Sequence, residues 1–135
     1  MSKEPKVIHS PLAVYLPRKT KEDRKMILNL NNYRNWQHFL SNNTKKAYKE
    51  VIAPQLEGLR FATPISLTFT LWQASKRRID RLNVLSIHDK FLLDAMTELG
   101  CIEDDNDDYV KETTYRTGGI DRENPRVDVE IFENL

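Results

Sequence analysis

The chain has only one cysteine, Cys101, among its 135 residues, and this excludes a disulfide bond within the chain. It also contains no apolar run close to the roughly 20 residues that a membrane helix needs. Its lysine-containing start lacks the apolar core of a signal peptide. We therefore expect a protein of the reducing cytoplasm that has no membrane partner.

Histidine and glycine are also scarce, and this excludes two common kinds of site. The three histidines, His9, His38 and His88, are scattered and come with one cysteine, which is not the spacing of a zinc site. The glycine pair at 118–119 does not open onto a helix, so it is not a phosphate-binding loop. His88 beside Asp89 is a candidate base, although a histidine on a helix surface is the more common outcome.

Charge is balanced in the whole chain, with a net charge of +1, but it is unevenly distributed along it. Residues 1–81 hold 16 Lys and Arg against 6 Asp and Glu, whereas residues 82–135 hold 5 against 14. Such asymmetry suggests a basic surface that meets a polyanion, beside an acidic cluster that holds cations. The alternative is that the two halves neutralise each other by pairing within the molecule.

The first half of the chain predicts two strands and one helix. Residues 7–16 are apolar and β-prone, with Pro11 marking an edge strand or a strand break, and residues 26–30 follow a charged loop as a second strand. Apolar residues recur at helical spacing over 43–56, with Asn43 or Thr44 as the N-cap. Pro54 should kink or end this helix.

The second half contains the clearest strand, residues 64–73, in which apolar and polar residues alternate. Ser86 is a candidate cap for a helix that continues to Leu99. Residues 109–117 and 126–132 alternate as well and are expected to form a closing hairpin. The chain should therefore be one α+β domain, residues 1–135, with a mixed or antiparallel sheet of about four to five strands packed with two main helices.

Carboxylates gather around the second helix and are the main functional lead. Asp80 precedes the helix, Asp89 and Asp94 lie on it together with Lys90, and the pair 104–105 follows it. Several oxygen ligands at close range suit Mg²⁺, with Mn²⁺ as a substitute. If the helix packs back on the sheet, we expect these carboxylates to converge on a metal that activates a water for phosphodiester cleavage.

Each of these residues also has a structural interpretation. Lys90 and Asp94 stand at i, i+4, the spacing of an ordinary salt bridge on a helix surface. Residues 104–108 fit a solvated acidic turn, in which one or two carboxylates are ligands.

Basic residues flank the first aspartate on both sides, as a nuclease needs in order to hold a phosphate backbone. The candidate DNA-binding residues are Lys76, Arg77, Arg78 and Arg81, extended by Lys45, Lys46 and Lys49 on the earlier helix and by Arg18, Lys19 and Lys21 in the first loop.

The order K-R-R-x-D-x-x-N, then D-K-x-x-x-D-A-M, E-L-G and I-E-D-D resembles the RusA family of Holliday-junction resolvases, including its phage and prophage members. The matching residues are Asp80, Asn83, Lys90, Asp94-Ala95-Met96 and Asp104-Asp105, within residues 76–108. The resemblance implies a RusA-like homodimer that binds branched DNA and cuts it with Mg²⁺ held by aspartates. It assigns Asp80 as the first acidic ligand, Asp105 as the late ligand with Asp104 beside it, Lys90 as the catalytic lysine, and Asn83 and Asp94 as supporting residues.

One position departs from the family pattern. The second aspartate of the family's Asp-x-Asp falls at Leu82, and the gap from Asn83 to Lys90 is about four residues longer than the family spacing. Either Asp89 replaces the missing carboxylate or the site has one ligand fewer. The expected function is Mg²⁺-dependent cleavage of four-way junctions; the alternatives are a DNA-binding or protein-interaction module with weak or no cleavage, and a nuclease for other branched or single-stranded DNA.

Overall fold

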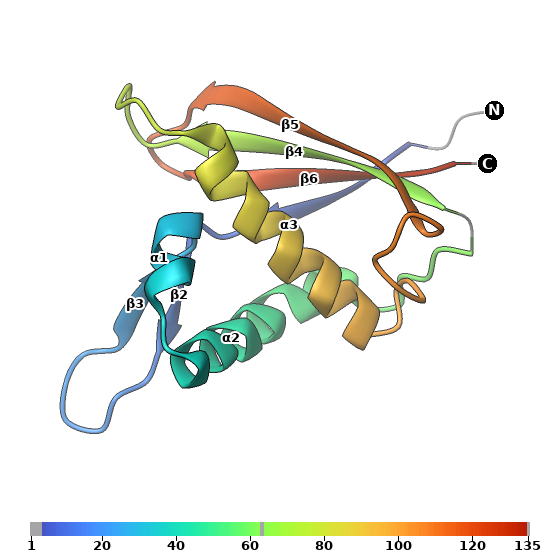
Figure 1. The fold of residues 1–135 in the computed structure, drawn as a ribbon. Coiled ribbons are helices and arrows are strands. Elements are labelled where there is room, and N and C mark those ends of the chain that lie inside the picture. The colour runs from blue at the N-terminus through green and yellow to red at the C-terminus, as the bar shows by residue number, and fades with distance from the viewer. Residues whose placement is uncertain (1–3, 63, 135) are drawn as a thin grey trace.

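A computed structural model describes residues 4–62 and 64–134 of this chain (Figure 1), so that residues 1–3, 63 and 135 of the expected domain 1–135 lie outside the description. The elements in chain order are β1 (Lys6–Ser10), β2 (Ala13–Leu16), β3 (Arg24–Ile27), α1 (Leu30–Asn35), α2 (His38–Leu56), β4 (Ile65–Gln73), α3 (Arg81–Glu98), β5 (Val110–Ile120) and β6 (Arg126–Glu133). This confirms the predicted α+β class. None of the helices in the described ranges is long and apolar enough to cross a membrane.

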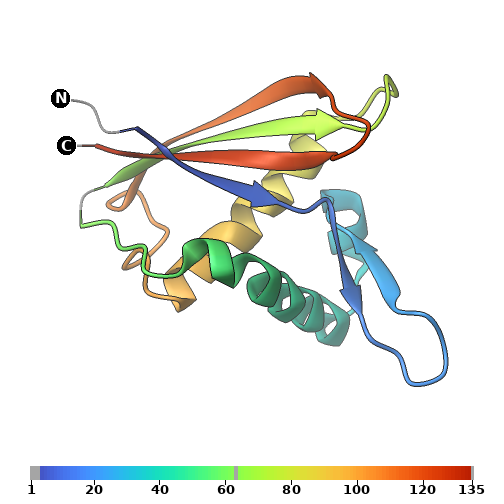
Figure 2. The same ribbon diagram turned by 180° about the vertical axis from the view of Figure 1, so that it is seen from behind.

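Four strands form a mixed sheet in the order β1-β6-β4-β5, and β2 and β3 form a separate two-stranded sheet. The helices α2 and α3 lie against the same face of the four-stranded sheet, as Figures 1 and 2 show from opposite sides. The alternation predicted for β4 explains this arrangement. Its residues Ile65, Leu67, Phe69 and Leu71 are all buried, and because alternate side chains of a strand share one face, they line the side that meets the helices.

The expected closing hairpin is wrong. β5 and β6 both pair with β4, β5 in parallel and β6 in antiparallel orientation, so that β4 lies between them. The connection from β5 to β6 passes the end of β4, where the backbone N–H of Asp121 donates to the carbonyl oxygen of Gln73 over 2.7 Å. Alternation identifies a strand and its buried face, but it carries no information on which strand lies beside it.

The N-terminal strands are shorter than predicted. Of the two interpretations of Pro11, an edge strand or a strand break, the structure shows the break. The two halves of segment 7–16 enter different sheets, as β1 and β2. The second strand ends at Ile27 rather than at residue 30. Asn29 then caps the short helix α1, because its side chain accepts a hydrogen bond from the N–H of Asn32 over 2.7 Å.

Both long helices begin earlier than their predicted caps. α2 starts at His38, and Thr44 lies inside it with its hydroxyl donating to the Leu40 carbonyl. α3 starts at Arg81, because the Asp80 carboxylate accepts a hydrogen bond from the N–H of Leu82 over 3.0 Å. Ser86 therefore lies within α3 and caps nothing. The helix α2 does end just after Pro54, at Leu56.

A buried polar network ties β1, α2 and α3 together. The Ser10 hydroxyl is hydrogen-bonded over 2.7 Å to the Tyr48 hydroxyl and over 2.7 Å to Nδ1 of His88. All three residues are fully buried, and burial lowers the pKa of His88 to about 3. His88 is therefore a neutral core residue, neither the surface histidine nor the base that the sequence suggested.

The burial of His88 predicts a loss of stability in mild acid. Unfolded, the imidazole has a pKa near 6.5 and binds a proton that the folded protein excludes down to about pH 3, so this stability is present above pH 6.5 and decreases as the pH falls. Between pH 7.5 and 5 the free energy of unfolding should drop by about 2 kcal/mol more in the wild type than in His88→Asn. Urea unfolding at both pH values measures this difference. An equal loss in the wild type and in His88→Asn would contradict the assignment.

Candidate functional site

The helix α3 carries five of the predicted site residues, and three of them, Asp89, Lys90 and Asp94, lie outside its buried face. Its opposite face is anchored in the core by Leu85, Phe91 and Leu92, each of them buried. Because that face is fixed, Asp89 and Asp94 are half-buried at the edge of the helix, and Lys90 is exposed. The side chains that could act on a substrate are thus positioned by the apolar periodicity of the same helix.

Asp89 is the most constrained of these carboxylates. The Tyr115 hydroxyl on β5 donates a hydrogen bond to its Oδ2 over 2.6 Å. Burial raises the pKa of Asp89, the Tyr115 hydrogen bond lowers it, and the charge of Asp105 raises it further. No sequence signal identifies Tyr115, which lies in a predicted strand and has no motif around it. The structure makes it the positioning partner of Asp89.

Asp105 lies in the loop between α3 and β5, beside Asp104. The Asp104 carboxylate accepts the backbone N–H of Asp105 over 2.8 Å. The pKa of Asp105 is raised by desolvation, then by hydrogen bonding and charge from Asp104, and then by the charge of Asp94. The acidic loop therefore runs close enough to α3 for Asp105 to interact with both Asp89 and Asp94.

Asp80 does not join this group. It caps the N-terminus of α3, whereas Asp104 and Asp105 follow the other end of the helix, and Figure 1 shows the two connections at opposite ends of the sheet. Asp89 lies nine positions after Asp80, which corresponds to about 14 Å along a helix axis. The expected convergence of Asp80 with Asp105 is thus replaced by a group of Asp89, Asp94, Asp104 and Asp105.

The donor atoms of this group fit a hard divalent cation. Within 4–62 and 64–134, no three His, Cys, Asp or Glu side chains are arranged as a ready metal cluster. The nearby groups are nevertheless carboxylate oxygens, the ligands that Mg²⁺ prefers. Their mutual repulsion contributes to the raised pKa of Asp89 and of Asp105, and a bound cation would relieve it. Asp89 and Asp105 are the residues that would hold such an ion, with Asp94 and Asp104 beside them.

The basic residues fall into two classes. Lys76, Arg77 and Arg78 are exposed in the connection from β4 to α3. By contrast, Lys45 and Lys49 reach across from α2 to acidic residues on α3, with distances of 3.9 Å from Lys45 Nζ to Asp94 and 2.8 Å from Lys49 Nζ to Glu98. Pairing within the molecule therefore explains part of the charge asymmetry.

The other candidate DNA-binding residues have different surroundings again. Arg81 donates to the Thr117 hydroxyl over 3.2 Å. Lys46 lines a groove between α2 and α3 together with the paired Lys45 and Lys49. In the loop between β2 and β3, Arg18 donates to the carbonyl oxygen of Glu22 over 2.7 Å.

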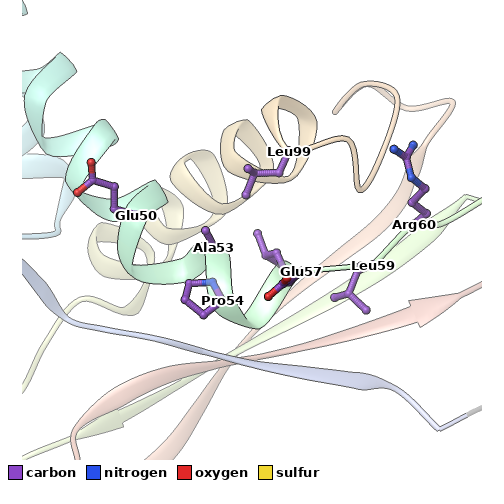
Figure 3. A pocket seen from close by; sticks show the side chains of 9 residues that line it. Glu50, Ala53, Pro54, Glu57, Leu59, Arg60 and Leu99 are labelled. Carbon is purple, nitrogen blue, oxygen red and sulfur yellow. The ribbon is translucent and has the colours of Figure 1, made fainter.

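Two cavities of similar size have different surroundings. One of about 670 Å³ lies between the end of α2, the loop that follows and Leu99, and none of the predicted site residues lines it (Figure 3). The other, of about 600 Å³, lies between the β4–α3 connection and the β3–α1 segment. We call it the Asp80 cleft, because Asp80, Asn83, Arg77 and Arg78 all line it. Asn83 also accepts a hydrogen bond from the backbone N–H of Asn31 over 3.0 Å, which fixes α1 beside the start of α3.

No protein-family model matches this chain, and no curated protein is similar to it in sequence. The likeness to the RusA resolvases therefore rests on the motif residues themselves and stays a prediction.

The proximity of Asp105 to Asp89 predicts a specific change in acidity. Asp105→Asn should lower the pKa of Asp89, because it removes a neighbouring negative charge, and Tyr115→Phe should raise it, because it removes a hydrogen bond to the charged form. Carbon-13 NMR titration of the aspartate carboxyl groups measures both shifts. Asp80→Asn is the matched control and should leave the pKa of Asp89 unchanged. An equal shift in Asp80→Asn and Asp105→Asn would contradict the placement of these residues.

Proposed function

We propose that this protein is a Mg²⁺-dependent structure-specific endodeoxyribonuclease of the RusA type, which resolves four-way DNA junctions in a cytoplasmic phage or prophage recombination pathway. The observation that carries the proposal is the charge of Asp105, from a separate loop, which raises the pKa of the half-buried Asp89 on α3; the exposed Lys90 follows Asp89 in the sequence. The motif order of the sequence supports it. The exposed basic connection 76–78 supports DNA as the polyanion.

In this proposal the metal ion is held chiefly by Asp89 and Asp105. Their proximity favours the interpretation in which Asp89 substitutes for the carboxylate that is missing at Leu82, and Mn²⁺ would occupy the same oxygen ligands as Mg²⁺. The bound ion would supply a polarised phosphate and an activated water. Tyr115 holds Asp89 in place through its hydrogen bond. Lys90 offers a point charge for the negative charge that develops on the phosphate and on the departing oxygen.

Resolution also requires two cuts, one in each of two symmetry-related strands. A homodimer with two-fold symmetry presents two such sites to the junction. We therefore include a homodimer in the proposal.

A second candidate is a DNA-binding or protein-interaction module of the same fold with weak or no cleavage. The observation in its favour is Leu82, which is 58% exposed at the position of the family aspartate and offers no ligand. The two candidates differ in catalysis and share the binding of branched DNA.

A cleavage assay separates the two candidates. Wild-type protein incubated with a synthetic four-way junction in Mg²⁺ or Mn²⁺ should nick two opposed strands symmetrically. Asp105→Asn and Asp89→Asn should each lower the rate by about a hundredfold or more, because several kcal/mol of transition-state stabilisation would be lost. Asp107→Asn makes the same charge change in the same loop and should retain activity.

Asp80→Asn in the same assay tests whether the family's first ligand acts at this site. Junction binding without cleavage by the wild type would contradict the nuclease and leave the binding module. Full activity of Asp89→Asn would refute its role as the substitute ligand. A panel of flaps, forks and single strands shows whether other DNA is preferred.

The two classes of basic residue predict different salt dependence. Replacing Lys76, Arg77 and Arg78 with glutamine should weaken junction binding and make the slope of log affinity against log salt less steep, by about 0.9 for each phosphate that is no longer neutralised. Replacing Lys45 and Lys49 should have the smaller effect, because their charges are already paired with Asp94 and Glu98. Binding by gel shift at about 50–200 mM salt, without divalent metal, measures both. Equal slopes for all variants would contradict the proposed role of the 76–78 connection.

A further inference from the structure

The Asp80 cleft is not explained by the metal site. It lies beside the N-terminus of α3, away from Asp105. Its walls come from four parts of the chain: Leu12 between β1 and β2, the β3–α1 segment, the end of β4 with its connection, and the first turn of α3. Its volume of about 600 Å³ falls in the range of sites for small organic ligands. The cleft is therefore large enough to take a chemical group of its own.

Two exposed aliphatic side chains line the cleft. Ile27 is 48% exposed and Ile79 is 45% exposed, and they come from different walls. A third apolar residue, Leu82, is 58% exposed in the adjacent turn of α3. Large apolar side chains left in water around a concave surface are typical of a binding site, and their faces suit a flat, weakly hydrated ring.

Polar groups with free hydrogen-bonding capacity line the same cleft. The Oδ1 atoms of Asp80 and Asn83 accept hydrogen bonds from the backbone, from Leu82 and Asn31 respectively. Within the described part of the chain, no hydrogen bond is formed by the amide nitrogen of Asn83 or by the second carboxylate oxygen of Asp80. One donor and one acceptor are thus available, and the edge of every nucleobase presents groups that pair with them.

The charges around the cleft indicate where a charged group of the ligand would bind. Arg77 and Arg78 line it and are exposed, so they are available to a phosphate. Asp80 would repel a phosphate placed beside it. An anion therefore belongs at the arginines, and an uncharged ring belongs between the two isoleucines.

We propose that the Asp80 cleft receives one unstacked nucleotide from the branch point of the DNA, with its base between Ile27 and Ile79 and its phosphate at Arg77 and Arg78. This inference rests on the proposed function, in that branched DNA is taken as the substrate. Strand exchange at a four-way junction interrupts base stacking, so a branch-point base is less costly to extrude than a base within a duplex. The cleft would then recognise the branch itself, separately from the residues that cut.

Filling the cleft tests the proposal. Ala74 lines it and is exposed, so Ala74→Leu reduces the space without removing a charge or a core residue. Ile79→Ser removes one apolar wall instead. The matched control is Ala53→Leu, which makes the same change in the cavity of Figure 3.

The probe is a four-way junction that carries 2-aminopurine at one branch-point position, bound in the absence of divalent metal so that it is not cut. Among the described residues, no aromatic side chain lines the cleft to quench the fluorophore, so its fluorescence should rise when wild-type protein or Ala53→Leu binds. The rise should be lost in Ala74→Leu and in Ile79→Ser. Removing the branch-point base, as an abasic site, should weaken binding about tenfold for the wild type and leave Ala74→Leu unaffected.

The possible results separate this inference from the proposed function. Binding and cleavage of the junction with no rise at any branch position, or an equal rise in Ala74→Leu and wild type, would overturn the cleft proposal alone. Failure of the wild type to bind any branched DNA would overturn both proposals.

Discussion

The parallel pairing of β4 with β5 determines the placement of most of the other elements. Parallel neighbours cannot be joined by a tight turn, and the chain must cross from one end of the sheet to the other between them. Here α3 makes that crossing, so the basic connection lies at one end of the sheet and the acidic loop at the other. Because the helix must lie on the sheet to make the crossing, its apolar face is buried and Asp89 is brought to Tyr115 on β5.

Much of the fold is readable from local patterns. The strand 64–73, the C-terminal half of α3 with its end before Gly100, and the last two strands follow from alternation and helical periodicity alone. The pairing of those strands does not, because β5 and β6 are neighbours in sequence but are separated in space by β4. The helix starts differ from expectation for another reason. An aspartate at position 80 suits metal binding, and it is equally a strong N-cap.

The candidate site, like the fold, could be predicted from the sequence only in part. Residues on one helix have relative positions that spacing fixes, so the grouping of Asp89, Lys90 and Asp94 could be predicted. The approach of Asp105 to that helix depends on the path of a loop, and the separation of Asp80 from it depends on the helix beginning at Arg81. The Asp80 cleft brings residue 27 together with residue 79, and no local pattern connects positions so distant in sequence.

The position of β6 also has a consequence for the order of folding. β6 pairs with β1 on one side and with β4 on the other, so that residues 6–10 join the sheet only through the last strand. During synthesis, β1 has no partner until residues 126–133 have left the ribosome. Ser10, and with it the hydrogen bonds to Tyr48 and His88, therefore reaches its final place late. The core of this domain cannot close before β6 has been made and has paired with β1.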